Sequence, residues 1–127
     1  MANGFHRSNE SWERIESPLK ILDHTLNEFA SRNRLILTKN ERDWPNRSFR
    51  WGQQPNLLIE IFLESEKELT YTMWVSASDE RSREEYWKHK TLFKAGPIDA
   101  LERELPNLLQ VAYGIAAEWI KAYNVDG

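Results

Sequence analysis

Residues 56–77 read NLLIEIFLESEKELTYTMWVSA, and this stretch gives the strongest indication of the fold. Apolar residues alternate with other residues in two runs, separated by a polar turn at residues 64–68. The alternating residues are Leu57, Ile59, Ile61 and Leu63 in the first run, and Leu69, Tyr71, Met73, Val75 and Ala77 in the second. Such alternation is typical of a strand with one buried face, and a one-residue slip would turn every apolar side chain outward. The stretch therefore predicts an antiparallel hairpin of defined register.

Amphipathic helical patterns lie on both sides of the hairpin. Before it, Ser17-Pro18 resembles an N-cap followed by proline at the first helical position, which predicts a helix ending near Asn33. The apolar stripe of this helix comprises Leu19, Leu22, Leu26 and Phe29. After the hairpin, Gly96-Pro97 opens a second helix, and its stripe comprises Ile98, Leu101, Leu105, Leu108, Ala112, Ile115 and Trp119. Pro106 lacks a backbone donor, so we expect this helix to break at Leu105-Pro106.

Three shorter runs, at residues 35–38, 48–51 and 86–95, complete the predicted sheet. The order of elements predicts a two-layer α+β fold. We expect an antiparallel sheet of about five strands, flanked in sequence by an N-terminal helix and a long C-terminal helix that pack on one face. Residues 1–16 are predicted to form a mobile N-terminal arm, and residues 17–127 a single α+β domain.

Composition excludes several classes of function. The 127 residues include 17 basic and 20 acidic side chains, and a net charge of −3 creates no general attraction for nucleic acid. The absence of cysteine excludes a disulfide framework, a thiolate zinc site and a cysteine nucleophile. No apolar run resembles a signal peptide or a bilayer span. We expect a cytoplasmic protein that binds no membrane, metal or cofactor.

Signatures of catalysis are missing, and we assign no catalytic residue. The five glycines are scattered, so no phosphate-binding loop is present, and no nucleophile elbow of the G-x-S-x-G type exists. An enzymatic role is therefore the less favoured interpretation. The alternative that remains is a small-ligand pocket, or an unorthodox enzyme, near Glu60 and His89. The structural interpretation of Glu60 is an ion pair with Lys88 or Lys90 on another strand. For His89, which should share a face with Phe93, it is a half-buried imidazole.

Arginine and aromatic residues are concentrated between residues 42 and 51. They occupy six of these ten positions, namely Arg42, Trp44, Arg47, Phe49, Arg50 and Trp51. Guanidinium donors interleaved with stacking surfaces are typical of a groove for single-stranded nucleic acid or a peptide. The competing interpretation is that Phe49 and Trp51, which share parity, point into the core while Arg50 pairs with acidic strands. The net charge argues against nucleic acid as the partner.

Trp74 has the opposite parity to the apolar residues of its strand, which places it with Phe62 and Trp87 on the other face of the sheet. A sheet with aromatic residues on both faces is usually covered on both, or uses one face for a partner. We therefore predict a non-enzymatic interaction domain, either a homodimer or a binder of another protein, in which Phe62 and Trp74 are neighbours. A groove for a small molecule, closed by residues 78–85, is the alternative.

Overall fold

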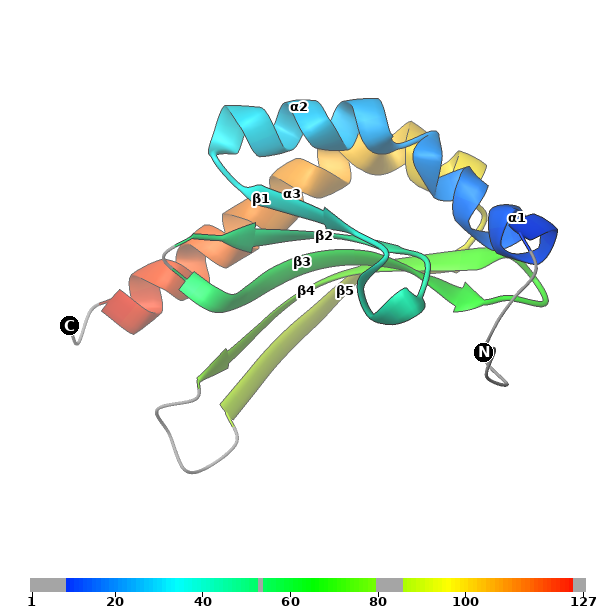
Figure 1. The fold of residues 1–127 in the computed structure, drawn as a ribbon. Helices are drawn as coiled ribbons and strands as arrows, with labels where there is room; N and C mark the ends of the chain where they lie inside the picture. Colours follow the sequence, from blue (N-terminus) through cyan, green and yellow to red (C-terminus); the bar gives the residue numbers. More distant parts are fainter. Residues whose placement is uncertain (1–8, 53, 80–85, 125–127) are drawn as a thin grey trace.

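The computed structural model of the chain describes residues 9–52, 54–79 and 86–124. These residues form two layers, with the helices on one face of a single antiparallel sheet (Figure 1). The elements are α1 (Asn9–Lys20), α2 (Asp23–Asn33), β1 (Ile36–Lys39), the short 3-10 helix η1 (Glu41–Asp43), β2 (Asn46–Trp51), β3 (Gln54–Ser65), β4 (Thr70–Asp79), β5 (Tyr86–Gly96) and α3 (Ile98–Asn124). The predicted α+β class and its flanking helices are confirmed.

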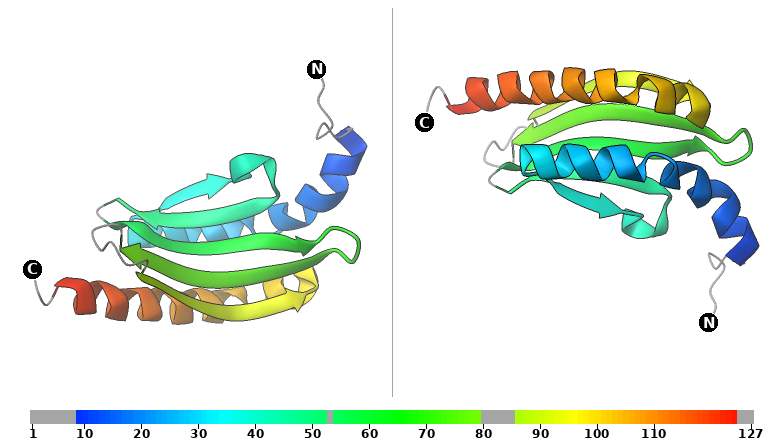
Figure 2. Two further views of the ribbon diagram at one scale, coloured as in Figure 1. Left: turned by 90° about the horizontal axis from the view of Figure 1, so that it is seen from below. Right: turned by 90° about the horizontal axis from the view of Figure 1, so that it is seen from above.

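The strands follow one another across the sheet in the order β1-β2-β3-β4-β5. The register of the β3–β4 hairpin matches the alternation in the sequence, because Ile59 lies opposite Val75 and Ile61 lies opposite Met73. Both pairs are buried beneath the helices. Seen from below, the sheet presents its other face with no helix in front of it (Figure 2).

The first helix begins earlier than the Ser17-Pro18 signal predicts, and that prediction is wrong. Residues 9–20 form α1, and Pro18 lies in its last turn, close to the break that precedes α2. The reason is tertiary packing: Ile15 and Leu19 are fully buried, and the Tyr71 hydroxyl donates a 2.9 Å hydrogen bond to the Ile15 carbonyl. Residues 9–16 thus belong to the packed domain, whereas residues 1–8 of the predicted arm lie outside the described residues.

The expected break of the C-terminal helix at Leu105-Pro106 is also wrong, because α3 continues through Pro106 to Asn124. Pro106 is exposed, so the carbonyl that loses its helical donor there can be hydrated instead. On the opposite side of the helix, the buried stripe continues without interruption through Leu101, Leu105, Leu109, Ala112 and Ala116. Burial of this stripe on the sheet offsets the cost of one internal proline.

An irregularity in β5 decides which of its side chains face the helices. Met73 lies opposite Phe93, but its neighbour Trp74 lies opposite Thr91, so Leu92 is an extra residue in the strand. Phe93 therefore packs against the core on the helix side. His89 lies on the other side, where its ring contacts Trp74. The predicted alternation, which put His89 and Phe93 on one face, is wrong for this physical reason.

Candidate functional site on the helix-free sheet face

The register brings residues of all five strands into rows on the face that the helices leave open, which we call the helix-free face. One row contains Ile36, Arg50, Leu58, Ser76 and His89. The next contains Thr38, Ser48, Glu60, Trp74 and Thr91. This face carries most of the polar and aromatic residues that the sequence singles out, and the sheet holds them on a rigid support.

The centre of the helix-free face is an aromatic contact between β3 and β4. The ring centroids of Phe62 and Trp74 are 4.6 Å apart with an interplanar angle of 53°. The imidazole of His89, on β5, meets the Trp74 indole edge to face, with the two ring centroids 4.5 Å apart. Phe62 and Trp74 are both half-buried, so each keeps surface for contact with another molecule. The prediction that these two aromatic residues are neighbours is confirmed.

Glu60 adjoins this cluster, and its Oε1 accepts a 3.0 Å hydrogen bond from the Trp74 indole N–H. Burial raises the pKa of Glu60 and the nearby charge of Glu41 adds to this shift, while the Trp74 hydrogen bond and the charges of Arg42 and Arg50 oppose it. The expected ion pair with Lys88 or Lys90 is wrong. These lysines lie opposite Ala77 and Val75 on the helix side of β5, because of the extra residue described above.

Two other carboxylates of the helix-free face have cationic partners. Both Glu41 oxygens accept 2.9 Å hydrogen bonds from Arg50, and one also accepts a 2.6 Å bond from the Ser48 hydroxyl. Burial raises the pKa of Glu41, but these bonds outweigh it and the pKa is lowered. Glu64 accepts a bond from Thr72 at 2.7 Å and pairs with Lys94 at 3.2 Å, and its pKa is lowered in consequence. These two groups remain ionised at neutral pH.

Arg47, predicted as a binding residue, is buried on the helix side with 1% of its surface exposed. Its guanidinium donates to Glu16 at 2.6 Å, to Asp23 at 2.7 Å and to Asn40 at 3.0 Å. These partners come from α1, from α2 and from the segment after β1, so one side chain joins three parts of the chain to β2. Enclosed in this way, Arg47 is not available to an external ligand, which corrects the prediction.

The aromatic residues of the same segment also serve the fold. Phe49 is buried and meets Phe29 edge to face at 5.4 Å. Trp51 stacks on Tyr113 of α3, with centroids 5.9 Å apart and an interplanar angle of 25°. The Trp44 indole N–H donates to the Leu63 carbonyl at 2.9 Å. The interpretation that Phe49 and Trp51 point toward the core is confirmed.

The remaining arginines of the segment lie on the open side of the sheet. Arg50 pairs with Glu41 of η1, not with an acidic strand as expected. Arg42, in the same short helix, is exposed. Sequence reasoning missed the part played by Glu41, because nothing local indicates that η1 folds back toward β2.

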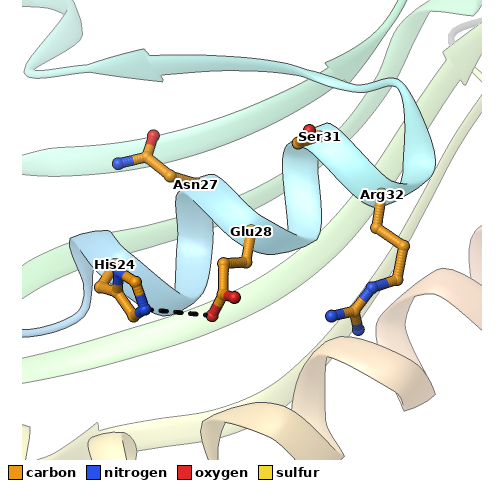
Figure 3. A pocket seen from close by; sticks show the side chains of 5 residues that line it. All are labelled: His24, Asn27, Glu28, Ser31 and Arg32. Carbon is orange, nitrogen blue, oxygen red and sulfur yellow. Dashed lines mark ion pairs between the residues drawn. The ribbon is translucent and has the colours of Figure 1, made fainter.

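Another group of polar side chains lies on α2, where a shallow depression is lined by His24, Asn27, Glu28, Ser31 and Arg32 (Figure 3). His24 pairs with Glu28 at 3.3 Å, and 87% of the His24 side chain is exposed. All five residues come from one helix, and neighbours on an exposed helix form such pairs without any ligand. The depression therefore carries no functional argument.

Two predicted elements lie partly outside the described residues. Trp87 belongs to β5, where it pairs with Ser78, but its side chain is not among those described. The loop expected to close a groove falls largely on residues 80–85, which are outside the described ranges.

Searches for other classes of site and for related proteins add no assignment. Among the side chains described, no three His, Asp or Glu residues are grouped so as to hold a metal ion. Within the same residues, no helix combines the length and apolar character needed to cross a bilayer. Comparison of the chain with protein-family models, with curated proteins and with solved structures finds no match. The case for a function therefore rests on the geometry of the helix-free face.

Proposed function

We propose that this chain is a non-enzymatic partner-binding protein that associates with a second copy of itself through the helix-free face. The observation that carries the proposal is the Phe62–Trp74 pair, which lies half-buried on a sheet face that no described α-helix covers. Large aromatic side chains are enriched at the centres of protein interfaces, where they contribute a large share of the binding energy.

The composition of the face supports an interface better than a second core. Around the aromatic pair lie small polar residues that their own neighbours bury, such as Ser48 and Thr72, and the ion pairs of Glu41 and Glu64. A cluster of aromatic residues inside a polar rim is the usual arrangement of a non-obligate interface. The rigid sheet keeps the entropic cost of docking low, since few side chains need to be ordered.

The edges of the sheet are less suited to pairing than its face. Strand β5 carries Lys88, Lys90 and Lys94 together with the extra residue at Leu92, and lysines and bulges are the usual protections of an edge strand. At the opposite edge, β1 has only four residues. Lateral addition of a strand is therefore disfavoured, which leaves the face as the surface for association.

A second copy is the occupant that we favour, because the helix-free face carries both signs of charge. Carboxylates at Glu41, Glu60 and Glu64 lie on the same side of the sheet as cations at Arg50 and Lys94. A face of mixed charge can meet a copy of itself without net repulsion. Most soluble oligomers are symmetric homo-oligomers, and two-fold dimers are the commonest among them.

Sedimentation equilibrium over a range of concentrations tests the proposal. We expect the wild-type chain to dimerise, and Trp74→Glu to remain monomeric with an unchanged far-ultraviolet circular dichroism spectrum. Val111→Glu is the matched control, since Val111 is an apolar residue that is 44% exposed on α3, in the other layer. A wild-type chain that stays monomeric at high concentration would refute self-association. A dimer that only Val111→Glu dissociates would refute the choice of face.

A small-ligand site at Glu60 and His89 is the second candidate function. The observation in its favour is that Glu60 and His89, on the strands at either side of β4, contact the same Trp74 ring system. Glu60 accepts a hydrogen bond from the indole N–H, and the His89 imidazole meets the ring edge to face. Fragment screening by NMR, following the Trp74 indole signal, tests this function. It is supported by ligands whose binding is lost in both Glu60→Gln and His89→Ala, and is refuted if no fragment shifts the signal.

A further inference from the structure

Among the described residues, Glu60 differs from the other two carboxylates of the helix-free face because no cation forms an ion pair with it; Arg42 and Arg50 of the same chain act on it only through their more distant charges. Glu41 pairs with Arg50, and Glu64 pairs with Lys94. Within the described part of the chain, Glu60 accepts only the hydrogen bond from Trp74 and forms no ion pair. It is also half-buried beside the aromatic pair that forms the centre of the proposed interface.

This difference matters when the face docks against another surface. Association would remove the remaining water from Glu60, and an ionised carboxylate buried without a partner is strongly unfavourable. If Glu60 is to stay ionised, the surface that covers Trp74 must therefore bring a cation or several donors to it. Glu41 and Glu64 make no such demand, because each already has its cation.

Arg42 is the cation on this chain that fits the requirement. It is exposed on η1, next to Glu41, whose carboxylate bonds to Ser48 and Arg50 of the helix-free face. Of the described cations near this face, namely Arg42, Arg50 and Lys94, Arg42 forms no ion pair with a described residue. Its charge nevertheless favours the ionised forms of Glu41 and Glu60 in its own chain.

The backbone that presents Arg42 is unusual. Asn40, Arg42 and Asp43 all have φ between 56° and 61°, a left-handed conformation that is uncommon for residues other than glycine. Reciprocal hydrogen bonds hold the turn: Glu41 N–H donates to the Asn46 side chain at 2.9 Å, and the Asn46 amide donates to the Glu41 carbonyl at 3.1 Å. Strained backbone of this kind persists only where the surroundings over-determine it. The turn thus holds the Arg42 backbone in place while leaving its side chain in solvent.

From these observations we propose that, in the dimer, Glu60 of each copy pairs with Arg42 of the other. The inference rests on the proposed function. In a two-fold face-to-face pair, each residue meets the residue that lies equally far on the opposite side of the axis. If the two-fold axis passes between Glu60 and η1, Glu60 of the first copy lies opposite Arg42 of the second. By symmetry, Arg42 of the first copy then lies opposite Glu60 of the second, so the contact forms twice. The reciprocal pairs supply the cation that each Glu60 lacks and fix the register of the two sheets.

A mixing experiment with single charge reversals tests the pairing. Glu60→Arg and Arg42→Glu should each weaken self-association at least about tenfold, because each places like charges opposite one another. An equimolar mixture of the two variants should form heterodimers of near wild-type affinity, since both contacts then join opposite charges. Native mass spectrometry of the mixture, with one variant isotope-labelled, measures the heterodimer directly.

Matched variants separate this pairing from contacts within one copy. If Arg42 instead paired with Glu60 of its own chain, mixing the two variants would not restore dimerisation. Each variant would still carry two like charges, at positions 42 and 60 of the same chain. Glu64→Arg and Lys94→Glu are the control, since that pair lies within one chain at 3.2 Å; mixing these two variants should give no recovery. Should a reversal unfold the chain, Glu60→Gln and Arg42→Gln replace it, and the double variant should then dimerise no more weakly than either single variant.

The outcomes distinguish this inference from the function on which it rests. If Trp74→Glu dissociates the dimer but the mixture of Glu60→Arg and Arg42→Glu stays monomeric, the pairing is refuted and the interface stands. If the wild-type chain does not dimerise, the proposed function fails first. Recovery in the mixture alone, without recovery in the Glu64 and Lys94 control, supports the pairing.

Discussion

Arg47 donates a 2.6 Å hydrogen bond to Glu16 inside the core, with 1% of the arginine side chain and 6% of the glutamate side chain exposed. This contact joins β2 to α1 across 31 positions of sequence. Asp23, at the start of α2, is the second acidic partner of Arg47, and its Oδ1 lies 2.7 Å from the Arg47 Nε. Burial alone would raise the pKa of Glu16, but the hydrogen bond and charge of Arg47 outweigh it and the pKa is lowered. The network holds the bend between α1 and α2 against the sheet.

Arg47→Met should destabilise the fold by about 3–5 kcal/mol, because it leaves two carboxylates without their buried cation. Urea denaturation followed by circular dichroism measures the change. Lys39→Met is the control, since Lys39 contacts the same Asp23 carboxylate at 3.4 Å but its side chain is 45% exposed. We expect the control to cost less than about 1 kcal/mol. Equal effects in the two variants would contradict the structural role of Arg47.

Glu60→Gln should stabilise the folded monomer at neutral pH, measured at a concentration too low for self-association. Folding raises the pKa of Glu60 above 4.5, so the protonated side chain contributes to the stability of the folded chain at acid pH. This contribution is lost as the pH rises through the pKa that Glu60 has in the folded chain. The glutamine of the Glu60→Gln variant cannot ionise, so the variant should melt at a higher temperature than wild type at about pH 7. At about pH 4 the two melting temperatures should be similar. Thermal unfolding at the two pH values measures this difference.

Glu64→Gln is the matched comparison for that pH dependence, because the pKa of Glu64 is lowered by Thr72 and Lys94. The pH dependence that Glu64 causes has the opposite sign. The ionised Glu64 side chain contributes to stability above pH 4.5, and this contribution is lost as the pH falls through the lowered pKa. Glu64→Gln should therefore melt below wild type at neutral pH. Shifts of the same sign in both glutamine variants would contradict the two assigned environments.

Ile61→Ala should cost about 2–5 kcal/mol, because Ile61 is 1% exposed at the centre of the buried face and its removal leaves a cavity. Ile36→Ala, at a position that is 55% exposed, should change the stability by no more than about 0.5 kcal/mol. The midpoints of chemical denaturation compare the two. An unchanged midpoint for Ile61→Ala would refute the assignment of this face to the core.

Gly114→Ala should stabilise the protein by about 1 kcal/mol, since alanine is the better helix former and nothing lies within 4 Å of the added Cβ. Gly96→Ala should have the opposite effect, because its Cβ would lie 2.5 Å from the Phe93 ring. Calorimetry of both variants measures the two signs. A destabilised Gly114→Ala would argue against a continuous α3 at that point.

Single-stranded oligonucleotides should not bind with the steep salt dependence that phosphate contacts cause. Of the arginines in the segment at residues 42–51, Arg47 is buried and Arg50 is paired with Glu41. Fluorescence anisotropy of a labelled oligonucleotide at low salt measures this. Tight, salt-sensitive binding that is lost in Arg50→Ala would overturn the expectation and restore the nucleic-acid hypothesis.

Local periodicity was sufficient to predict the hairpin and the identity of its buried face. Ile59, Ile61, Met73 and Val75 are buried as their alternation indicates, because a strand can bury one face only by placing apolar residues at every second position. The same logic placed Phe62 and Trp74 together on the other face, since parity and hairpin register are both local properties. This part of the candidate site was therefore predictable from the sequence.

The elements that local reasoning misplaced depend on contacts with distant parts of the chain. The N-terminal helix extends back to Asn9, where Ile15 and Leu19 pack on the sheet, and α3 passes through Pro106 because the stripe on its other side stays buried. Each helix contains a proline, which removes one backbone hydrogen bond and so carries the same local energetic cost in both. Whether that cost ends a helix depends on the burial energy available nearby, which no local pattern records.

The α+β class, the antiparallel hairpin and the two faces of its strands follow from local periodicity, because a side-chain period of two or 3.6 residues specifies which face of an element is apolar. The roles of the charged residues, by contrast, depend on contacts that the folded chain makes between distant positions. Arg47 and Arg50 are three positions apart, yet the first is enclosed by Glu16 and Asp23 while the second meets Glu41 on the open side. A charged side chain takes its role from the partners that the fold brings within about 3 Å, and these partners come from distant positions in the chain.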